Sequence, residues 1–235
     1  MLYLQTPAII LQKTQIKDFK YILKILSEKQ GLISLDVEIN NLIQPAHIQP
    51  PNLMDVKIIT NKYKKLSALE MKPLYIYQSL YTNYKKNIIA QFISEILIKS
   101  IQEELADEKV FHLSFQSFIE LDKAPSEELP VFHLHFLKKY ITYTGHSPLN
   151  NYDDKHPHFH LKEGRFTSYS TPMSLSADDS KYIYQLFFEE TFPSTKLPIS
   201  RLTHYLIDYL KYHLSLQHLH SLPFLKEAIA LNDSL

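Results

Sequence analysis

Hydrophobic and polar residues alternate along much of the first 70 or so positions, a pattern typical of β-strands with one buried face. The clearest case is the segment 33–39, in which Ile, Leu, Val and Ile are interleaved with Ser, Asp and Glu. The pattern predicts five short strands in all: Thr6–Leu11, Phe19–Leu26, Ile33–Ile39, Met54–Thr60 and Leu66–Met71.

Turn residues separate these strands. Glu28–Gly31 has the composition of a hairpin turn, and Gln44–Asn52 contains three prolines, which favour a loop or a crossing at the edge of a sheet. Five short strands that meet at tight turns within so short a segment predict a small closed β-barrel of the OB-fold type.

From Tyr81 onward the hydrophobic period becomes helical. Seven apolar residues between Ile88 and Ile101 recur at three- and four-residue spacing, the strongest helix signal in the chain. Further helices are predicted at 108–121, 130–143, Asp178–Thr191 and Ile199–Leu214, with a last short one opened by Pro223.

The expected fold is therefore α+β, with an OB-fold domain at residues 1–76 and a helical domain at 77–235. Within the second domain, residues 144–175 lack a sustained period and predict irregular structure with a short hairpin. The residues expected in the core are Ile22, Ile33, Leu35, Val56, Ile58, Phe92, Ile96, Leu137, Leu206 and Tyr209.

Composition excludes several classes of protein. The chain has no cysteine, so disulfides, thiolate metal sites and cysteine nucleophiles are absent. Its three glycines lie far apart, which excludes a Walker A loop and a Rossmann fingerprint. No segment has the length of uninterrupted apolar sequence that a membrane helix needs, and the N-terminus lacks the basic start of a signal peptide. We therefore expect a cytoplasmic protein without a bound cofactor.

Charge is balanced overall but not along the chain. The 25 basic residues equal the 25 acidic ones, whereas residues 1–72 contain ten lysines and six acidic residues, a net charge of +4. This asymmetry favours the N-terminal domain for any polyanion contact, although chance alone accounts for so small a difference.

The order of several segments resembles the RecO family, particularly its Bacteroidetes-type members. The similar segments are Thr6–Leu11, Glu28–Ser34, Leu53–Glu70, Lys72–Leu80, Ala90–Leu97, Phe132–Leu137, Leu161–Phe166, Leu206–Leu214 and Ser221–Glu227. Each alone is unspecific, but together they span nearly the full length in the right order.

This resemblance implies a recombination mediator in DNA repair, with no catalytic site. Members of the family bind single- and double-stranded DNA, anneal complementary strands, and help load recombinase at gaps together with RecR and the acidic C-terminal tail of single-stranded-DNA-binding protein. By the same resemblance the protein works at the bacterial nucleoid.

The chain departs from the family pattern in two ways. Many members hold zinc through cysteines that this chain lacks. The family also has a basic, glycine-rich loop after the third strand, but the corresponding segment Glu38–Pro45 contains no lysine or arginine. Each lost phosphate contact lowers the affinity for DNA.

The best remaining basic element is the fourth strand with its following turn. Its lysines are suited to neutralise phosphates and its tyrosine to stack on a base, so we predict DNA binding by Lys57, Lys62, Tyr63, Lys64 and Lys65. The alternative is a solvated strand edge that resists aggregation. Lys13, Lys17, Lys20 and Lys24 add positive charge on the first hairpin.

An acidic peptide tail requires an apolar pocket with a basic rim. Candidate partner-binding residues at helix ends are Lys138, Lys139, Tyr140, Arg201 and Lys211. For each one alone, a favourable interaction with the helix dipole is the simpler explanation.

Histidines gather in the segment that holds zinc in relatives: His146, His156, His158 and His160. Three of them alternate, but Pro157 interrupts the strand and no complete ligand set is evident, so we expect no metal site. Two other hypotheses stay open: a divergent scaffold that acts only through protein contacts, and a small metal-dependent hydrolase built on these histidines.

Overall fold

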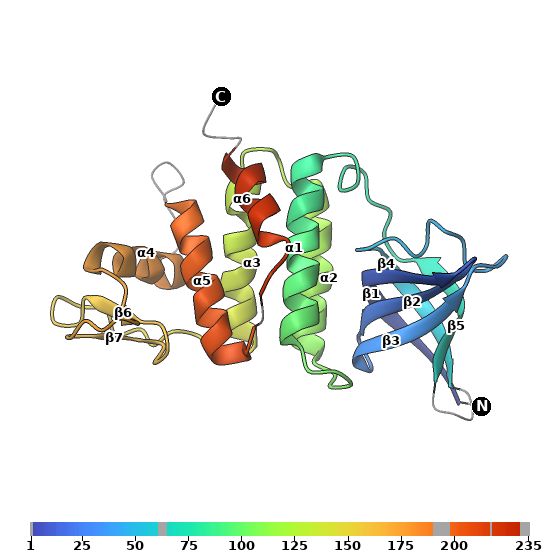
Figure 1. Ribbon diagram of the computed structural model, residues 1–235, viewed down its shortest axis with the longest axis horizontal. Coiled ribbons are helices and arrows are strands. Elements are labelled where there is room, and N and C mark those ends of the chain that lie inside the picture. The colour runs from blue at the N-terminus through green and yellow to red at the C-terminus, as the bar shows by residue number, and fades with distance from the viewer. Residues whose placement is uncertain (1, 61–64, 190–197, 217, 231–235) are drawn as a thin grey trace. The chain divides into compact units, whose positions relative to one another are not determined.

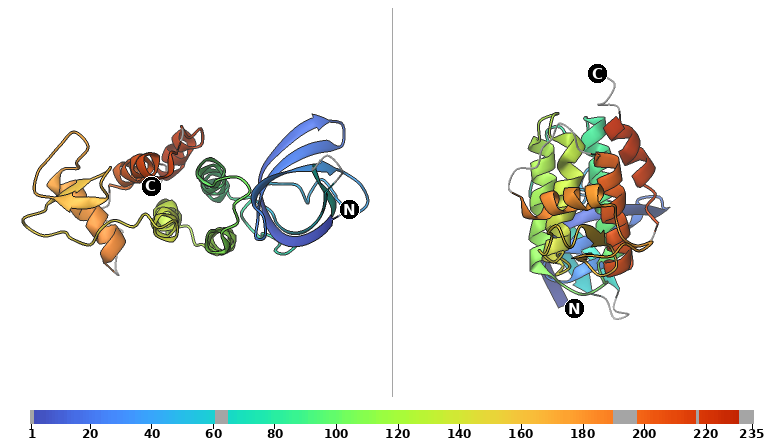
Figure 2. Two further views of the ribbon diagram at one scale, coloured as in Figure 1. Left: turned by 90° about the horizontal axis from the view of Figure 1, so that it is seen from below. Right: turned by 90° about the vertical axis from the view of Figure 1, so that its left-hand side faces the viewer.

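The computed structural model describes residues 2–60, 65–189, 198–216 and 218–230 (Figure 1). Its first five strands form a closed barrel, seen end-on in the left panel of Figure 2. The strands are β1 (Leu2–Lys17), β2 (Lys20–Ser27), β3 (Gly31–Glu38), β4 (Leu53–Thr60) and β5 (Leu66–Pro73).

The strand order around the barrel is β1-β2-β3-β5-β4. All neighbours are antiparallel except β3 and β5, which are parallel and pair through a single position, Asp36 opposite Ser67. This order and the closure confirm the predicted OB-fold barrel.

The barrel core contains the inward residues of every strand, because side chains alternate between the two faces of a strand. In β4, for example, Val56 and Ile58 are buried while Lys57 between them is exposed. The loop before β4 also contributes Ile43 and Ile48, both almost completely buried, to this core. The loop was predicted at this place, but its role in filling the barrel was not.

Nine of the ten predicted core residues are buried, and Ile22 is not. The correction has a simple cause, since a shift of one residue along a strand moves a side chain to the opposite face. Tyr21, Leu23 and Ile25 follow one face of β2, and Leu23 and Ile25 are fully buried. Ile22 lies on the other face, opposite Thr14 and Asp36 in the neighbouring strands, and is 37% exposed.

Six helices follow within the described residues, as the change of period predicts. They are α1 (Tyr84–Ser100), α2 (Glu108–Lys123), α3 (Leu129–Tyr143), α4 (Ala177–Phe188), α5 (Ile199–Leu214) and α6 (Leu222–Ala230). The expected hairpin in the irregular segment is β6 (His158–His160) paired with β7 (Arg165–Thr167). The predicted end of the fourth helix, Thr191, lies outside the described residues.

A buried carboxylate joins the segment after β5 to the helices. Asp122 of α2 accepts hydrogen bonds from the backbone N–H groups of Gln78, Ser79 and Leu80 at 2.8–2.9 Å, and the backbone oxygen of Asp122 accepts one from the Lys86 ammonium at 2.6 Å. Burial alone raises the pKa of Asp122, but these N–H donors outweigh it and the pKa is lowered. The contacts fix the chain between barrel and helices.

The chain divides into two compact units. Unit 1 comprises residues 1–125 and 219–235 and thus contains the barrel with α1, α2 and α6, whereas unit 2 comprises residues 126–218. The domain boundary predicted at residues 76/77 lies where strands give way to helices, and it differs from the boundary between these units. It stays a prediction. None of the helices in the described part of the chain is long and apolar enough to cross a membrane.

Candidate nucleic-acid interface

A groove of about 530 Å³ opens on the barrel where β3 and β5 meet. Its walls come from the β1–β2 hairpin, from β3 and from β5, and the residues that matter below are Ile16, Lys20, Ile22, Asp36, Glu38 and Lys65. OB-folds bind oligonucleotides on the face of strands 2 and 3, between the β1–β2 and β4–β5 loops. The groove occupies this position.

The β1–β2 hairpin forms one wall because β1 is long. Only Leu2–Ile9 of β1 pair with β4, and the strand continues along β2 to Lys17. Register shifts after Ile10 and after Gln15 bend this extension, since a bulge adds local twist.

Phe19 lies at the tip of this hairpin, and its side chain is 66% exposed. Its backbone adopts a left-handed conformation with φ of 61°, which costs a residue with a large side chain about 1–2 kcal/mol. Its carbonyl oxygen accepts a hydrogen bond from Ile39 N–H at 2.8 Å, which ties the tip to the end of β3. An aromatic ring is thus presented to solvent beside the groove.

The sequence-based prediction missed Phe19, because it placed the residue inside the second strand. A polar turn signal was present, since Lys17 and Asp18 stand immediately before Phe19 in the sequence. Ile16, 61% exposed, adds a second apolar side chain to the same hairpin.

The cations of the groove are engaged in ion pairs. Lys20 of β2 lies 3.3 Å from the carboxylate of Glu38, its direct cross-strand neighbour in β3. Lys65 of β5 lies 3.2 Å from the carboxylate of Asp36. Among the described residues that line it, the groove therefore contains two positive and two negative charges that form ion pairs.

The predicted DNA-binding residues are only partly brought together. Lys65 lines the groove, whereas Lys57 is exposed on β4 between Gln5 and Glu70 of the adjacent strands. Lys62, Tyr63 and Lys64 lie outside the described residues. A role of these five residues in DNA binding stays a prediction.

The predicted partner-binding residues do not form one cluster. Arg201 lies 3.1 Å from Asp179, and Lys211 lies 2.8 Å from Asp208. These two cations are ten residues apart on α5, which corresponds to about 15 Å along a helix. Lys139 is exposed and Lys138 half-buried, and burial lowers the pKa of Lys138.

Tyr140 requires a correction, because its side chain is completely buried and stacks on Phe136 with 5.7 Å between ring centroids. Tyr140 lies in the last turn of α3, as the predicted helix implies, but on the face that is buried in unit 2 together with Phe136 and Leu137. Tyr140 is therefore not available to a partner. The other four residues stay predictions.

The histidines of unit 2 have separate partners. His156 lies 2.8 Å from Asp153, His158 Nδ1 lies 3.1 Å from the Leu175 carbonyl oxygen, and His160 faces Glu163 at 3.8 Å. The described residues contain no group of three or more potential metal ligands. In α3, His133 is buried and His135 is exposed.

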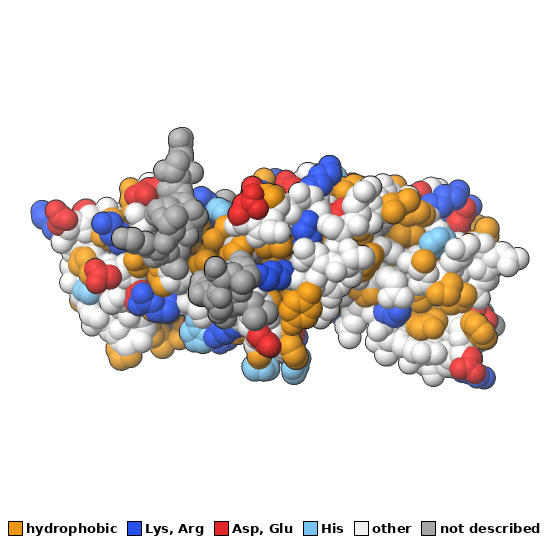
Figure 3. All heavy atoms as spheres, turned by 90° about the horizontal axis from the view of Figure 1, so that it is seen from above, with side chains coloured by type: hydrophobic (Ala, Val, Ile, Leu, Met, Phe, Trp, Pro, Cys, Tyr) orange, Lys and Arg blue, Asp and Glu red, His pale blue; other side chains and the backbone are white. Residues whose placement is uncertain are grey.

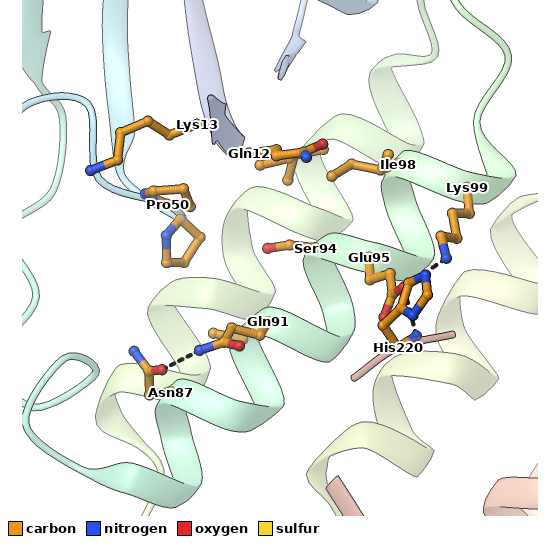
Figure 4. A pocket seen from close by; sticks show the side chains of 13 residues that line it. Gln12, Lys13, Pro50, Asn87, Gln91, Ser94, Glu95, Ile98, Lys99 and His220 are labelled. Atoms are coloured by element: carbon orange, nitrogen blue, oxygen red, sulfur yellow. Dashed lines mark hydrogen bonds and ion pairs between the residues drawn. The ribbon is translucent and has the colours of Figure 1, made fainter. Parts of the chain in front are cut away.

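A second pocket, of about 500 Å³, lies in unit 1 between β1, the loop around Pro50 and α1 (Figure 4). Uncharged polar side chains of α1 line it, and Asn87 accepts a hydrogen bond from Gln91 at 2.6 Å. At one end Glu95 accepts hydrogen bonds from the backbone N–H groups of His220 and Ser221, both at 2.8 Å, and pairs with Lys99 at 2.7 Å. This carboxylate thus caps the N-terminus of α6.

Among the described residues on the face shown in Figure 3, lysines and arginines lie singly or beside acidic side chains. The groove on the barrel and the exposed tip of its hairpin thus remain the features that fit a nucleic-acid ligand best.

Comparison with known proteins bears on this reading. Residues 81–153 match the family model described as "Recombination protein O C terminal". The DNA repair protein RecO of Flavobacterium johnsoniae is 28% identical over 189 residues, which cover 78% of each chain. That of Flavobacterium psychrophilum is 28% identical over 225 residues, 90% of this chain and 92% of the relative.

The chain is similar to RecO over most of its length. The similarity extends beyond the helical segment of the family model into the barrel, because the second alignment covers nine-tenths of the chain. The resemblance predicted from the order of short segments is thereby confirmed. Among solved structures, an aspartyl tRNA synthetase from Entamoeba histolytica aligns over 97% of this chain and 55% of its own, with 8% identity and a TM-score of 0.21, which carries no argument about fold.

Proposed function

We propose that this RecO-like chain acts in DNA repair as a recombination mediator that binds single-stranded DNA in the barrel groove. The observation that carries the proposal is the exposed Phe19 ring at the tip of the hairpin that forms one wall of a groove, which lies at the ligand-binding position of an OB-fold. Bases stack on such rings whatever their sequence, which suits a protein that must act at any gap.

The finer steps of the proposal follow from the resemblance to RecO. They are annealing of complementary strands, contact with double-stranded DNA, and loading of recombinase together with RecR and the C-terminal tail of single-stranded-DNA-binding protein at the nucleoid. Lys138, Lys139, Arg201 and Lys211 are the proposed contacts for the partner proteins. The chemistry proposed here is binding alone, without a catalytic residue.

A titration of a fluorescein-labelled oligonucleotide of about 16 nucleotides, followed by anisotropy, tests the DNA contact. We expect the wild-type chain to bind, and Phe19→Ala to bind at least about fivefold more weakly, since one stacked base contributes about 1–3 kcal/mol. The matched control is Phe224→Ala, which removes another exposed ring, on α6, away from the groove.

Absence of binding by the wild-type chain, even at low salt, would contradict the proposed DNA contact. The protein-only scaffold would then be the better hypothesis, and the ion-paired state of the groove lysines is the observation that favours it.

A further inference from the structure

Four charged side chains of the barrel groove form two internal ion pairs. Lys20 and Glu38 are direct neighbours across β2 and β3, and Lys65 and Asp36 connect β5 to β3. The lysine side chains are 55% and 68% exposed, so both ammonium groups are accessible from solvent. Both carboxylates come from β3. Asp36 is also the residue of β3 that pairs with β5, opposite Ser67.

We infer that Asp36 and Glu38 compete with the phosphates of a nucleic acid for Lys20 and Lys65, and that this competition sets both the affinity and the strand preference of the groove. The inference rests on the proposed function and concerns how the same site is regulated.

The physical argument compares two anions for each lysine. A carboxylate held at 3.2–3.3 Å occupies the position that a phosphate oxygen would take. A bound strand must therefore either displace the carboxylate or lie beside a neutral pair. In both cases the nucleic acid releases fewer counterions, in net terms, than it would on binding a lysine without a carboxylate partner. The affinity therefore falls less steeply with salt.

The preference for single-stranded over duplex DNA follows from the uncharged groups that the groove exposes. Apart from the ion-paired side chains, the described residues that line the groove are uncharged and mostly apolar, and they include the exposed Ile16 and Ile22. The exposed Phe19 ring lies at the tip of the hairpin that forms one wall. Aromatic rings stack on the unpaired bases of single strands, whereas duplex binding depends mainly on phosphate contacts. A groove with internally paired lysines thus favours single-stranded over duplex DNA.

The test compares the wild-type chain with the double variant Asp36→Asn/Glu38→Gln, which keeps the side-chain shapes and releases both lysines. Binding of the same single-stranded oligonucleotide and of its duplex is measured between about 50 and 200 mM NaCl. At low salt we expect the variant to bind the single strand about fivefold to tenfold more tightly, with a salt dependence steeper by up to about 1.4 logarithmic units per decade. The ratio of single-strand to duplex affinity should fall.

The matched control is Glu127→Gln/Glu128→Gln, which adds the same two units of net charge at exposed positions of unit 2. Glu38→Gln alone releases one lysine and should give an intermediate effect, which covers the case in which the double variant fails to fold. Equal gains in the double variant and the control would overturn the inference, because net charge alone would then explain the change. If the wild-type chain binds DNA and the double variant binds it equally well, the inference is overturned but the proposed function is not. If neither protein binds DNA, the inference and the proposed function are both contradicted.

Discussion

At the scale of single residues, the β1–β2 and β2–β3 turns show two uses of the left-handed conformation. Gly31 has φ of +70° at the start of β3, and a Cβ atom there would lie 2.2 Å from the Leu105 carbonyl oxygen, so that only glycine fits. Phe19 adopts a similar conformation with a large side chain that is mostly in solvent. Its strain is therefore not balanced by burial, which is typical of residues kept for function rather than stability.

Phe19→Gly should separate the effect of the Phe19 ring on DNA binding from the effect of its backbone conformation on stability. Because glycine adopts a positive φ without steric cost, we expect the free energy of unfolding to stay unchanged or rise by up to about 1 kcal/mol. Urea denaturation measures this change, and anisotropy on the same sample should show weakened binding of single-stranded DNA. A clear loss of stability would mean that the Phe19 ring supports the fold.

At the scale of elements, helices in both units depend on residues distant in sequence. Glu95 of α1 caps α6 across 125 residues of chain. Burial by itself raises the pKa of Glu95, but hydrogen bonds from Lys99, Ser221 and the His220 backbone together lower it to about 2. In unit 2, His133 of α3 lies 2.6 Å from the Thr203 hydroxyl of α5, and burial lowers its pKa to about 3.

Glu95→Gln should lower the free energy of unfolding of unit 1 by about 2–3 kcal/mol at pH 7. The pKa of the folded state lies below the ordinary value, so this stabilisation is fully present above about pH 5 and is lost as the pH falls toward 2. Urea titrations at pH 7 and pH 3 should show the difference between wild type and variant shrinking. Glu104→Gln, an exposed glutamate of the same unit, serves as the control.

His133→Gln should remove a different pH dependence. Protonation of His133 favours the unfolded chain, because its folded pKa lies below the ordinary value of 6.5. Stability is therefore complete above about pH 6.5, and unit 2 should lose about 2 kcal/mol between pH 7 and pH 5. The variant should show a flatter profile in thermal melts over this range, whereas His204→Gln, exposed on α5, should keep the wild-type slope.

At the scale of the whole molecule, the two compact units carry different titrating contacts. The buried histidine belongs to unit 2, and the capping glutamate belongs to unit 1. Net charge is zero, so general charge repulsion at neutral pH does not obscure these local effects.

Acidification from pH 7 to pH 5 should therefore affect the units unequally. Hydrogen exchange, corrected for the intrinsic rate at each pH, should become faster in α3 and α5 and stay nearly unchanged in α1 and α6, because Glu95 titrates well below this range. Equal acceleration in both units would show that they unfold as one cooperative body.

The order and type of nearly every element follow from the amino-acid sequence, because the period of hydrophobic residues is a local property of each segment. The closed barrel follows from the sequence as well, since five short strands with tight turns have few other ways to bury one face each. The same reasoning placed Leu35, Val56 and Phe92 in the core, and it misplaced Ile22, which lies on the outward face of β2.

The candidate site, in contrast, depends on contacts between residues that are distant in the sequence. The pairing of Lys65 with Asp36 and of Lys20 with Glu38 joins residues 29 and 18 positions apart, and no local pattern encodes such partners. The burial of Tyr140 and the capping of α6 by Glu95 likewise depend on which elements pack together. A basic residue in the sequence is a potential phosphate contact, but the fold decides whether a carboxylate already holds it.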